Sequence, residues 1–396
     1  MLRKADPEQA RQINTDLILD SVRKRDLVSR AELSRILSVS KMTASTIVSD
    51  LIERGLLVET DSSTSGSSAG GRPPVLLTLD TSQNFIIGVD IGTTTVSLVV
   101  GNLKGQILEQ QRIPTKRDRT VESILDQVEG LVRSLVESVS VPISSVLGVG
   151  VSVAGLVDKK RGYVRFSPDF NWQDVEFRTL LQDRLQLPVV IDNCTRAAAL
   201  GEMWYGAATE AKTFFYVNVG YGIGSAVVID GRGYEHDSEF GHIHVTSSPL
   251  QCECGKMGCL EAVSSGRAIE QFANEGKHGD VEHDWITAKE LSIAAEQGDP
   301  EAKGIFDKAG KYLGRAISTV ANLLSPELVI VGGGISRSGE LIMDPLEREF
   351  SVHTMEAIIE TTTICRSKLG VDASVVGAMA LALDTLVFHQ SQLANR

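Results

Sequence analysis

A chain of 396 residues is too long for one compact core, so its length predicts two or three domains. Its N-terminus is polar, and no uninterrupted apolar run approaches the roughly 18 residues that span a bilayer. We therefore expect a soluble, cytoplasmic protein without a membrane partner. The formal net charge of −12, taken alone, argues against nucleic-acid binding.

The charge is unevenly distributed along the chain. Residues 1–72 hold eleven Lys and Arg against ten Asp and Glu, a net charge of +1, whereas the remaining residues carry −13. Any contact with DNA must therefore come from this N-terminal head, with the acidic body held away from the duplex.

The head has the spacing of a helix-turn-helix. Apolar periodicity predicts a first helix over 12–24, a capping box of Ser29 and Glu32 starts a second, and the turn 38–40 leads into a third over 41–54. The inner faces are expected to hold Ile13, Leu17, Ile18 and Val22 of the first helix and Met42, Ile47, Val48, Leu51 and Ile52 of the third. The residues expected in the major groove are Lys41, Thr43, Ala44, Ser45 and Thr46.

A two-stranded wing is predicted after the third helix. Residues 56–59 and 75–79 have the composition of antiparallel strands, and the Gly-Gly-Arg-Pro-Pro segment between them would let Arg72 reach a narrow minor groove. For the three helices, the alternative is an ordinary helical bundle with a solvated polar face. For the segment that contains Arg72, the alternative is a flexible linker. The hairpin favours a winged helix-turn-helix DNA-binding domain over 1–80.

The remaining residues, 81–396, alternate apolar strands with glycine turns and amphipathic helices. The expected elements are strands over 85–89, 95–100 and 106–112, a helix over 121–138, and strands over 146–153, 213–219, 223–230 and 328–331. The recurrence predicts two α/β lobes with a cleft between them. The first lobe would comprise about 85–193 with a C-terminal helix over about 374–396, and the second about 194–373.

Three glycine-rich turns follow strands of this body. Tight turns favour glycine for steric reasons alone, but three such turns in this order are typical of a clamp for nucleotide phosphates. The candidate remnants of nucleotide loops are Asp90, Gly92, Thr94, Gly222, Gly224, Gly332 and Gly333.

Three of the five cysteines fall within eight residues, which favours metal binding over disulfides in a cytosolic chain. Cys252, Cys254 and Cys259 with His242 make a soft tetrahedral ligand set suited to zinc, and four protein ligands leave no position for a catalytic water. The zinc would therefore be structural. A reduced cysteine cluster without metal, or His244 as the fourth ligand, are the alternatives.

Three segments in this order behind a winged head resemble the ROK family of repressors and sugar kinases, and within it the xylose and N-acetylglucosamine repressors. They are residues 90–94 (DIGTT), 239–242 (EFGH) and 252–261 (CECGKMGCLE). The resemblance implies a two-lobed, actin/hexokinase-like (ribonuclease H-like) sugar-kinase fold. It also implies sugar contacts at Gly155, Asn193, Glu239, His242 and Glu261, with zinc bracing the pocket. From the residues alone, both glutamates could equally be surface acids.

The chain departs from the kinases of that family at the turn after Asp192. Those kinases carry Asn-Asp, with the aspartate as general base, whereas this chain has Asn193-Cys194. Losing a general base typically costs a factor of about 100 to 10,000 in rate, so we expect sugar binding without catalysis and no requirement for ATP. The alternative is a register slip that brings Asp192 into the role of the base.

These features favour a sugar-responsive transcriptional regulator, most simply a repressor of carbohydrate-utilisation genes that sugar binding relieves. Its partners would be double-stranded operator DNA, a sugar or sugar phosphate, and further copies in a homodimer or homotetramer that spaces two heads on a two-part operator. An ATP-dependent sugar kinase with an added DNA-binding head is the rival from another class. A third hypothesis is that the chain is a scaffold for protein–protein interactions.

Overall fold

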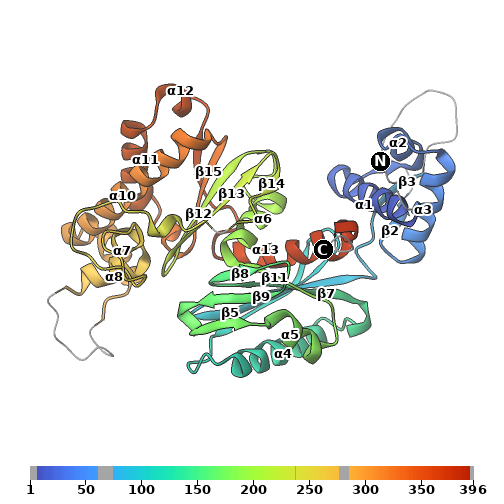
Figure 1. Ribbon diagram of the computed structural model, residues 1–396, viewed down its shortest axis with the longest axis horizontal. Helices are drawn as coiled ribbons and strands as arrows, with labels where there is room; N and C mark the ends of the chain where they lie inside the picture. The colour runs from blue at the N-terminus through green and yellow to red at the C-terminus, as the bar shows by residue number, and fades with distance from the viewer. Residues whose placement is uncertain (1–6, 61–74, 237, 276–284, 393–396) are drawn as a thin grey trace, which may run out of the picture. The chain divides into compact units, whose positions relative to one another are not determined.

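The computed structural model describes residues 7–60, 75–236, 238–275 and 285–392. These residues form two compact units, one of Met1–Cys194 with Ala378–Arg396 and the other of Thr195–Gly377 (Figure 1). The head therefore belongs to the same unit as the first lobe. The expected C-terminal helix from about 374 contributes to the first unit only from Ala378.

The head is a three-helix bundle with a small sheet, as a winged helix-turn-helix requires. Ser29 accepts a hydrogen bond from the backbone N–H of Glu32, whose carboxylate accepts one from the Ser29 N–H at 2.9 Å, so the predicted capping box is confirmed. The three-stranded sheet has the order β1-β3-β2. The elements are α1 (Pro7–Arg25), β1 (Val28–Ser29), α2 (Arg30–Ile36), α3 (Lys41–Glu53), β2 (Leu57–Thr60) and β3 (Leu76–Leu79).

Two details of the predicted head core are wrong. On α1, Ile13 and Leu17 are 43% and 44% exposed. On α3, Met42 is 80% exposed, whereas Ala44 is fully buried. The buried positions of α3 are 44, 47, 48 and 51, which share one helical face, and the 3.6-residue period places position 42 with the exposed positions 46 and 49.

The body part of the first unit is built on a five-stranded sheet of order β11-β7-β4-β5-β6. β4, β5 and β6 form the predicted antiparallel meander, and β7 and β11 continue the sheet in parallel. A second sheet has the order β10-β9-β8. The elements are β4 (Phe85–Ile91), β5 (Thr95–Asn102), β6 (Ile107–Pro114), α4 (Val121–Ser138), β7 (Val146–Val153), β8 (Leu156–Asp158), β9 (Tyr163–Ser167), β10 (Trp172–Val175), α5 (Phe177–Leu185) and β11 (Val189–Asn193).

The second unit repeats this design with a sheet of order β14-β13-β12-β15-β16. β12 pairs antiparallel with β13 and parallel with β15, as β4 does with β5 and β7. The strands are β12 (Phe214–Val219), β13 (Ile223–Ile229), β14 (Arg232–Gly233), β15 (Leu328–Gly332) and β16 (Thr363–Arg366). The helices are α6 (Cys194–Tyr205, whose first residue is in the first unit), α7 (Glu261–Ser264), α8 (Gly266–Ala273), α9 (Ala288–Glu296), α10 (Pro300–Leu324), α11 (Glu340–His353), α12 (Glu356–Ile359) and α13 (Ala373–Ala382, which ends in the first unit).

One helical stretch, Gly370–Phe388, is long and apolar enough to cross a membrane by length and composition. Asp372, Ser374 and Asp384 interrupt it in sequence, which is why a search for an uninterrupted apolar run passes over it. Of its most apolar window, 72% is buried inside the protein. A side chain at Gly150 of β7 would collide with the backbone of Ala378, so this stretch packs as a core helix.

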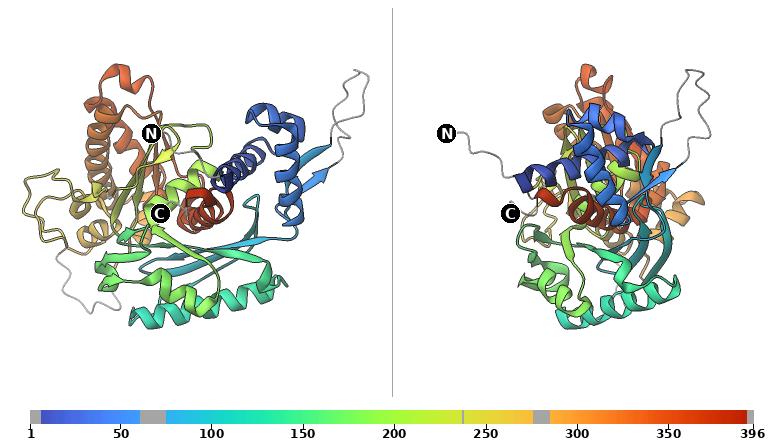
Figure 2. Two further views of the ribbon diagram at one scale, coloured as in Figure 1. Left: turned by 45° about the vertical axis from the view of Figure 1, so that its right-hand side comes forward. Right: turned by 90° about the vertical axis from the view of Figure 1, so that its right-hand side faces the viewer.

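The head contacts the rest of its unit directly. The Lys104 ammonium lies 2.6 Å from an Asp26 carboxylate oxygen, and the Asn84 amide donates to the backbone carbonyls of Arg54 and Gly55. α1 also lies beside the end of the chain, the π-helical turn Leu383–Phe388 and the short helix Gln390–Gln392 (Figure 2). These contacts explain why the head and the first lobe form one unit.

Candidate metal centre and sugar-binding residues

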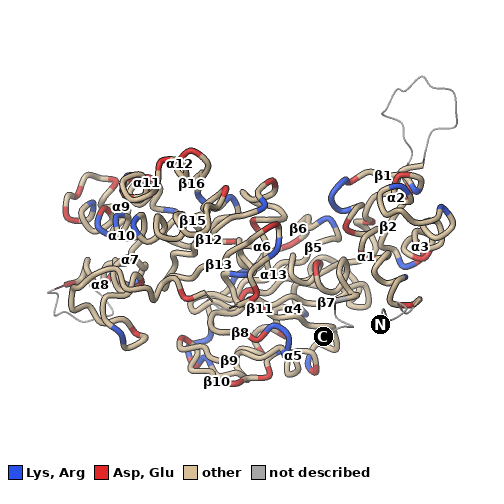
Figure 3. Tube along the Cα trace, turned by 45° about the horizontal axis from the view of Figure 1, so that its top comes forward, with Lys and Arg blue, Asp and Glu red and all other residues tan. Residues whose placement is uncertain are grey.

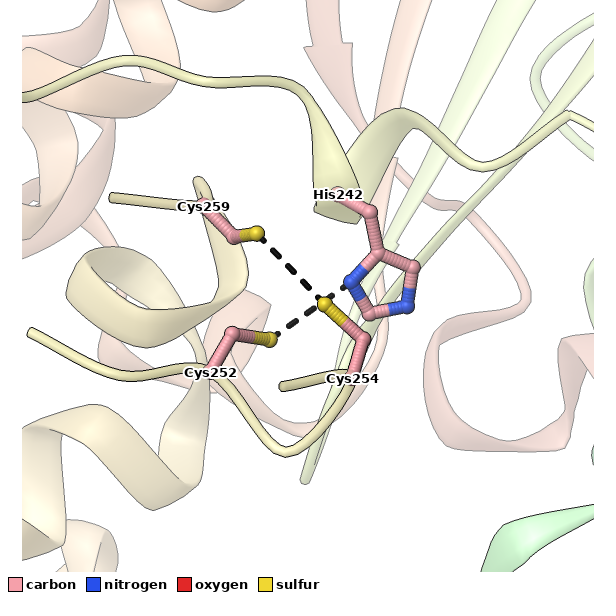
Figure 4. Close-up of side chains that lie close together, drawn as sticks. All are labelled: His242, Cys252, Cys254 and Cys259. Carbon is pink, nitrogen blue, oxygen red and sulfur yellow. Dashed lines mark hydrogen bonds between the residues drawn. The ribbon is translucent and has the colours of Figure 1, made fainter. Parts of the chain in front are cut away.

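Two loop segments of the second unit bring four potential metal ligands together. His242 ends a short 3₁₀ turn (Phe240–His242), and Cys252 and Cys254 lie in a tight turn closed by the hydrogen bond from the Cys252 N–H to the Lys256 carbonyl, 2.8 Å. Backbone pairing of His244 with Cys259 aligns the two segments. The ligand atoms of His242, Cys252, Cys254 and Cys259 all lie within 4.8 Å of one another (Figure 4).

The distances in this cluster fit a tetrahedral zinc ion. Bonds of about 2.3 Å to sulfur and about 2.0 Å to nitrogen would separate two sulfur ligands by about 3.8 Å and a sulfur from a nitrogen by about 3.5 Å. The Sγ atoms of Cys254 and Cys259 are 3.7 Å apart, and the Cys252 Sγ is 3.6 Å from the His242 Nδ1. The residues therefore have the chemistry and the spacing to hold zinc as a structural ion.

The cysteines need to lose protons before they can bind metal. Burial raises the pKa of Cys252 to about 12 and also raises the pKa of Cys259. Burial opposes ionisation of Cys254 as well, but a hydrogen bond from the Lys256 backbone lowers its pKa below the ordinary value. Without metal, Cys252 and Cys259 are thus protonated near neutral pH, and metal binding would release their protons.

His242 and Glu239 form a pair on the outer side of the cluster. The His242 Nδ1 faces the sulfurs, and its Nε2 lies 3.7 Å from a Glu239 carboxylate oxygen. A carboxylate in this place orients a metal-bound imidazole. His244 is not among the four ligands, and a side chain at Gly258 would meet its ring at 2.9 Å.

Glu261 connects the cluster to the turn between β12 and β13. One carboxylate oxygen accepts a hydrogen bond from the Ile223 N–H at 2.8 Å, and the other lies 3.7 Å from the Cys252 Sγ. Glu239 and Glu261 thus both lie beside the metal centre in the second unit, although the Glu239 side chain is 54% exposed.

The other two expected sugar-binding residues lie together in the first unit. The Asn193 side-chain amide donates to the Gly155 carbonyl at 2.8 Å. Gly155 has φ +123°, and a Cβ there would collide with the Phe166 carbonyl oxygen, so only glycine fits. This contact joins the end of β11 to the turn before β8.

The junction of β11 and α6 carries Asp192, Asn193 and Cys194. Asn193 is the last residue of β11, and Cys194 begins α6. The Asp192 carboxylate accepts a hydrogen bond from the Asn193 N–H at 2.7 Å and lies 3.7 Å from the Lys159 ammonium. Asp192 is buried and engaged by these groups.

Close packing explains why glycine occupies several positions of the glycine-rich turns. Side chains at Gly222 and Gly224 would press on Glu261 and Thr195, and one at Gly332 would collide with Tyr216. Gly333 has φ +84°. These contacts account for the glycines without any bound phosphate.

In the first glycine turn, Gly92 and Thr94 lie between β4 and β5, where the Gly92 N–H donates to the Thr95 carbonyl. Burial raises the pKa of Asp90 to about 6, although the Ser152 hydroxyl donates to its carboxylate at 2.6 Å.

The predicted DNA-contacting residues divide into three groups. Lys41 and Thr46 are exposed, and Thr43 and Ser45 are half-buried, near the start of α3. Ala44 is fully buried, so its predicted contact with bases is wrong, because the helical face it shares with Ile47 forms the head core. Arg72 lies outside the described residues. Figure 3 marks both basic and acidic positions on the head.

Sequence reasoning missed Arg267 of α8. Its side chain is mostly buried, forms an ion pair with Glu253 between two of the cysteines, and lies over the Tyr221 ring at 4.6 Å from the ring centre. No spacing signal identifies this residue, because its partners lie 14 and 46 positions away in the chain.

The chain is similar to known proteins over most of its length. The profile of the ROK family matches residues 86–385. A xylose repressor of Caldicellulosiruptor bescii is 29% identical over 95% of this chain and 97% of its own length. A crystal structure of a glucokinase from Streptomyces griseus, in complex with glucose and AMPPNP, is 33% identical over 76% of this chain and all of that one, with a TM-score of 0.68. A ROK family transcriptional regulator described as a homologue of the Escherichia coli MLC protein matches the fold over 98% of this chain and all of its own, with 23% identity and a TM-score of 0.83.

Proposed function

This chain belongs to the ROK family, and we propose that it is a sugar-responsive transcriptional repressor. The observation that supports this most is the extent of the similarity. Likeness to a xylose repressor covers 95% of the chain, including the head, whereas likeness to a glucokinase covers only 76%. The part that distinguishes this chain from a sugar kinase is therefore the part that it shares with a repressor.

Three features of the head support a role in DNA binding. Ser40 caps α3 by accepting the Thr43 N–H at 3.0 Å, so the helix begins with Lys41 and exposed polar side chains at the end that normally enters the major groove. The Arg30 guanidinium donates to the Ser45 carbonyl and pairs with Glu59 of β2, which holds α3 against the wing. We propose that Lys41, Thr43, Ser45 and Thr46 contact operator DNA, with Arg72 near the minor groove.

The body supplies the groups for sugar recognition. Sugar hydroxyls are bound by carboxylates, amides and similar polar groups, and we propose roles in sugar contact for Gly155, Asn193, Glu239, His242 and Glu261. Zinc, held by His242 and the three cysteines, would fix the loop that carries the last three of these groups. Sugar binding would then change the fit of paired heads to the operator.

A sugar kinase is the second candidate, favoured by the likeness to glucokinases. Cys194 stands against it, because a neutral thiol is a poor proton acceptor for a sugar hydroxyl. We propose that the body binds sugar and does not phosphorylate it at a useful rate, so that ATP is not required for the response.

The test starts from DNA sites selected by the purified full chain out of a random duplex library. Binding to the selected duplex is then measured by fluorescence anisotropy with xylose, glucose, glucosamine derivatives and their 6-phosphates. We expect one of these compounds to weaken DNA binding at least about tenfold, corresponding to a coupling of about 1.4 kcal/mol. Asn193→Ala should still bind the duplex but lose the response. Failure to select any duplex would exclude the proposal.

A further inference from the structure

Two loops of the second unit meet through a small set of side chains. We call residues 252–259 the metal loop and residues 220–225, the turn after β12 together with the first three residues of β13, the glycine loop. We propose that Arg267 and Glu261 are positioning residues that couple occupancy of the metal centre to the conformation of the glycine loop.

Arg267 provides the first link between the loops. Its guanidinium pairs with Glu253, which lies between Cys252 and Cys254, and the same group lies over the ring of Tyr221 in the glycine loop, 4.6 Å from the ring centre. The Arg267 side chain is only 15% exposed, whereas Glu253 is 63% and Tyr221 47% exposed, so Arg267 is held at a fixed place while its two partners remain in contact with water.

Glu261 provides the second link. Its Oε2 accepts the hydrogen bond of the Ile223 N–H at 2.8 Å, and its Oε1 lies 3.7 Å from the Cys252 Sγ. Gly222 passes so close to this carboxylate that a Cβ would lie 2.5 Å from Oε2. The two carboxylate oxygens thus contact one residue of each loop.

The start of α8 adds backbone contacts to the same place. The Gly266 N–H donates to the Gly220 carbonyl at 2.8 Å, and the Arg267 N–H donates to the Tyr221 carbonyl at 3.3 Å. These bonds place the root of the Arg267 side chain against the glycine loop. Movement of the metal loop would therefore disturb the pairing of Arg267 with Glu253 or its stacking on Tyr221.

The physical consequence is a coupling between two equilibria. Zinc would hold Cys252 and Cys254, and with them the Glu253 carboxylate that neutralises Arg267. Without metal the metal loop loses its cross-links, Arg267 loses a fixed partner, and the glycine loop opens more often. The glycine loop would then be ordered, and able to bind a ligand in one conformation, only in the metal-bound protein. The proposal rests on the metal centre and does not depend on the repressor function.

Hydrogen exchange of the purified full chain, read by mass spectrometry on peptides covering 219–226, tests the coupling. With one zinc bound per chain, Arg267→Met should make the glycine-loop amides exchange about tenfold faster than in the wild type. Chelation of zinc should do the same to the wild type and add little to Arg267→Met. Arg348→Met is the matched control, since it removes an ion pair with Asp307 from α11 of the same unit and should leave the loop unchanged.

Two further variants keep the test decisive if Arg267→Met is unstable. Glu253→Gln removes the ion pair from the metal-loop side and should accelerate exchange of the glycine loop in the same direction. Arg267→Lys retains the charge and should restore part of the protection. Unchanged glycine-loop exchange in chelated wild type, or in zinc-bound Glu253→Gln with intact protection of α10, would overturn the proposal.

Discussion

The backbone N–H of Ser391 donates a hydrogen bond to the Asp16 carboxylate at 2.9 Å, joining residues that are 375 positions apart. The other oxygen of Asp16 accepts the Gln12 side-chain amide at 3.0 Å. Nearby, the Arg23 guanidinium lies 5.8 Å from the centre of the Phe388 ring. Helix α1 of the head is thus docked on the end of the chain.

Replacing Asp16 by alanine should destabilise this docking. Asp16 is buried, and its loss leaves the Ser391 N–H and the Gln12 amide without their acceptor, which typically costs about 1–3 kcal/mol. Urea unfolding of Asp16→Ala measures the change. Asp50→Ala in the same head, which removes exposed ion pairs with Arg11 and Arg54 at 3.7 Å, should cost less than about 1 kcal/mol. Equal effects of the two substitutions would contradict the docking role of Asp16.

The stability of the protein should also depend on pH through His389, which lies in the C-terminal segment beside α1. A hydrogen bond with Asp384 raises the pKa of His389, burial opposes this, and the charges of Asp384, Asp20 and Asp16 add to the rise. Because the folded pKa lies above the unfolded value of about 6.5, the stabilisation is full below about pH 6.5 and is lost as the pH rises through the folded pKa. The stability difference between wild type and His389→Gln should therefore shrink with rising pH. A difference independent of pH would exclude this role.

Removing one cysteine ligand should release the metal. Cys254 is exposed, so Cys254→Ser opens no cavity, and we expect it to lower both the zinc content and the sugar affinity. Metal analysis and a thermal-shift titration measure the two effects. Cys365→Ser, outside the cluster, should retain one zinc per chain. Wild-type protein purified without chelators and containing no metal would refute the prediction.

Placing a carboxylate at position 194 should test whether the absence of a general base there limits sugar phosphorylation. The wild type is expected to bind sugar but to phosphorylate it far more slowly than the about 1 per second of ordinary enzymes. Cys194→Asp should raise that rate by a factor of about 100 or more. A coupled assay with ATP and magnesium measures both. Robust phosphorylation by the wild type would defeat the assignment as a sensor.

Substitutions at the start of α3 should separate DNA contact from head packing. Lys41→Ala should weaken operator binding, reduce its salt dependence by about one released ion, and leave stability unchanged. Ala44→Leu, at a fully buried position, should instead lower the unfolding free energy by about 1–3 kcal/mol. Anisotropy titrations at several salt concentrations, with urea unfolding beside them, distinguish the two. Unaltered DNA binding in Lys41→Ala would remove it from the interface.

The sequence alone was sufficient to predict those elements that depend on residues close together in the chain. The capping box of Ser29 and Glu32, the helix Val121–Ser138 and the strand Val146–Val153 all depend on hydrogen bonds or periodicity within a few residues, and the structure places them as predicted. The cysteine cluster was also predictable, because three of its ligands are neighbours in the chain and zinc accepts few other ligand types.

Tertiary structure alone decided what depends on distant partners. The pairing of Arg267 with Glu253 and Tyr221, and of Asp16 with Ser391, leaves no trace in composition or period. Periodicity shows which side of a helix or strand is apolar, but it does not show which element covers that side. A contact between residues far apart in the sequence contributes free energy only after the fold has brought the two residues together, so only the tertiary structure decides these pairs.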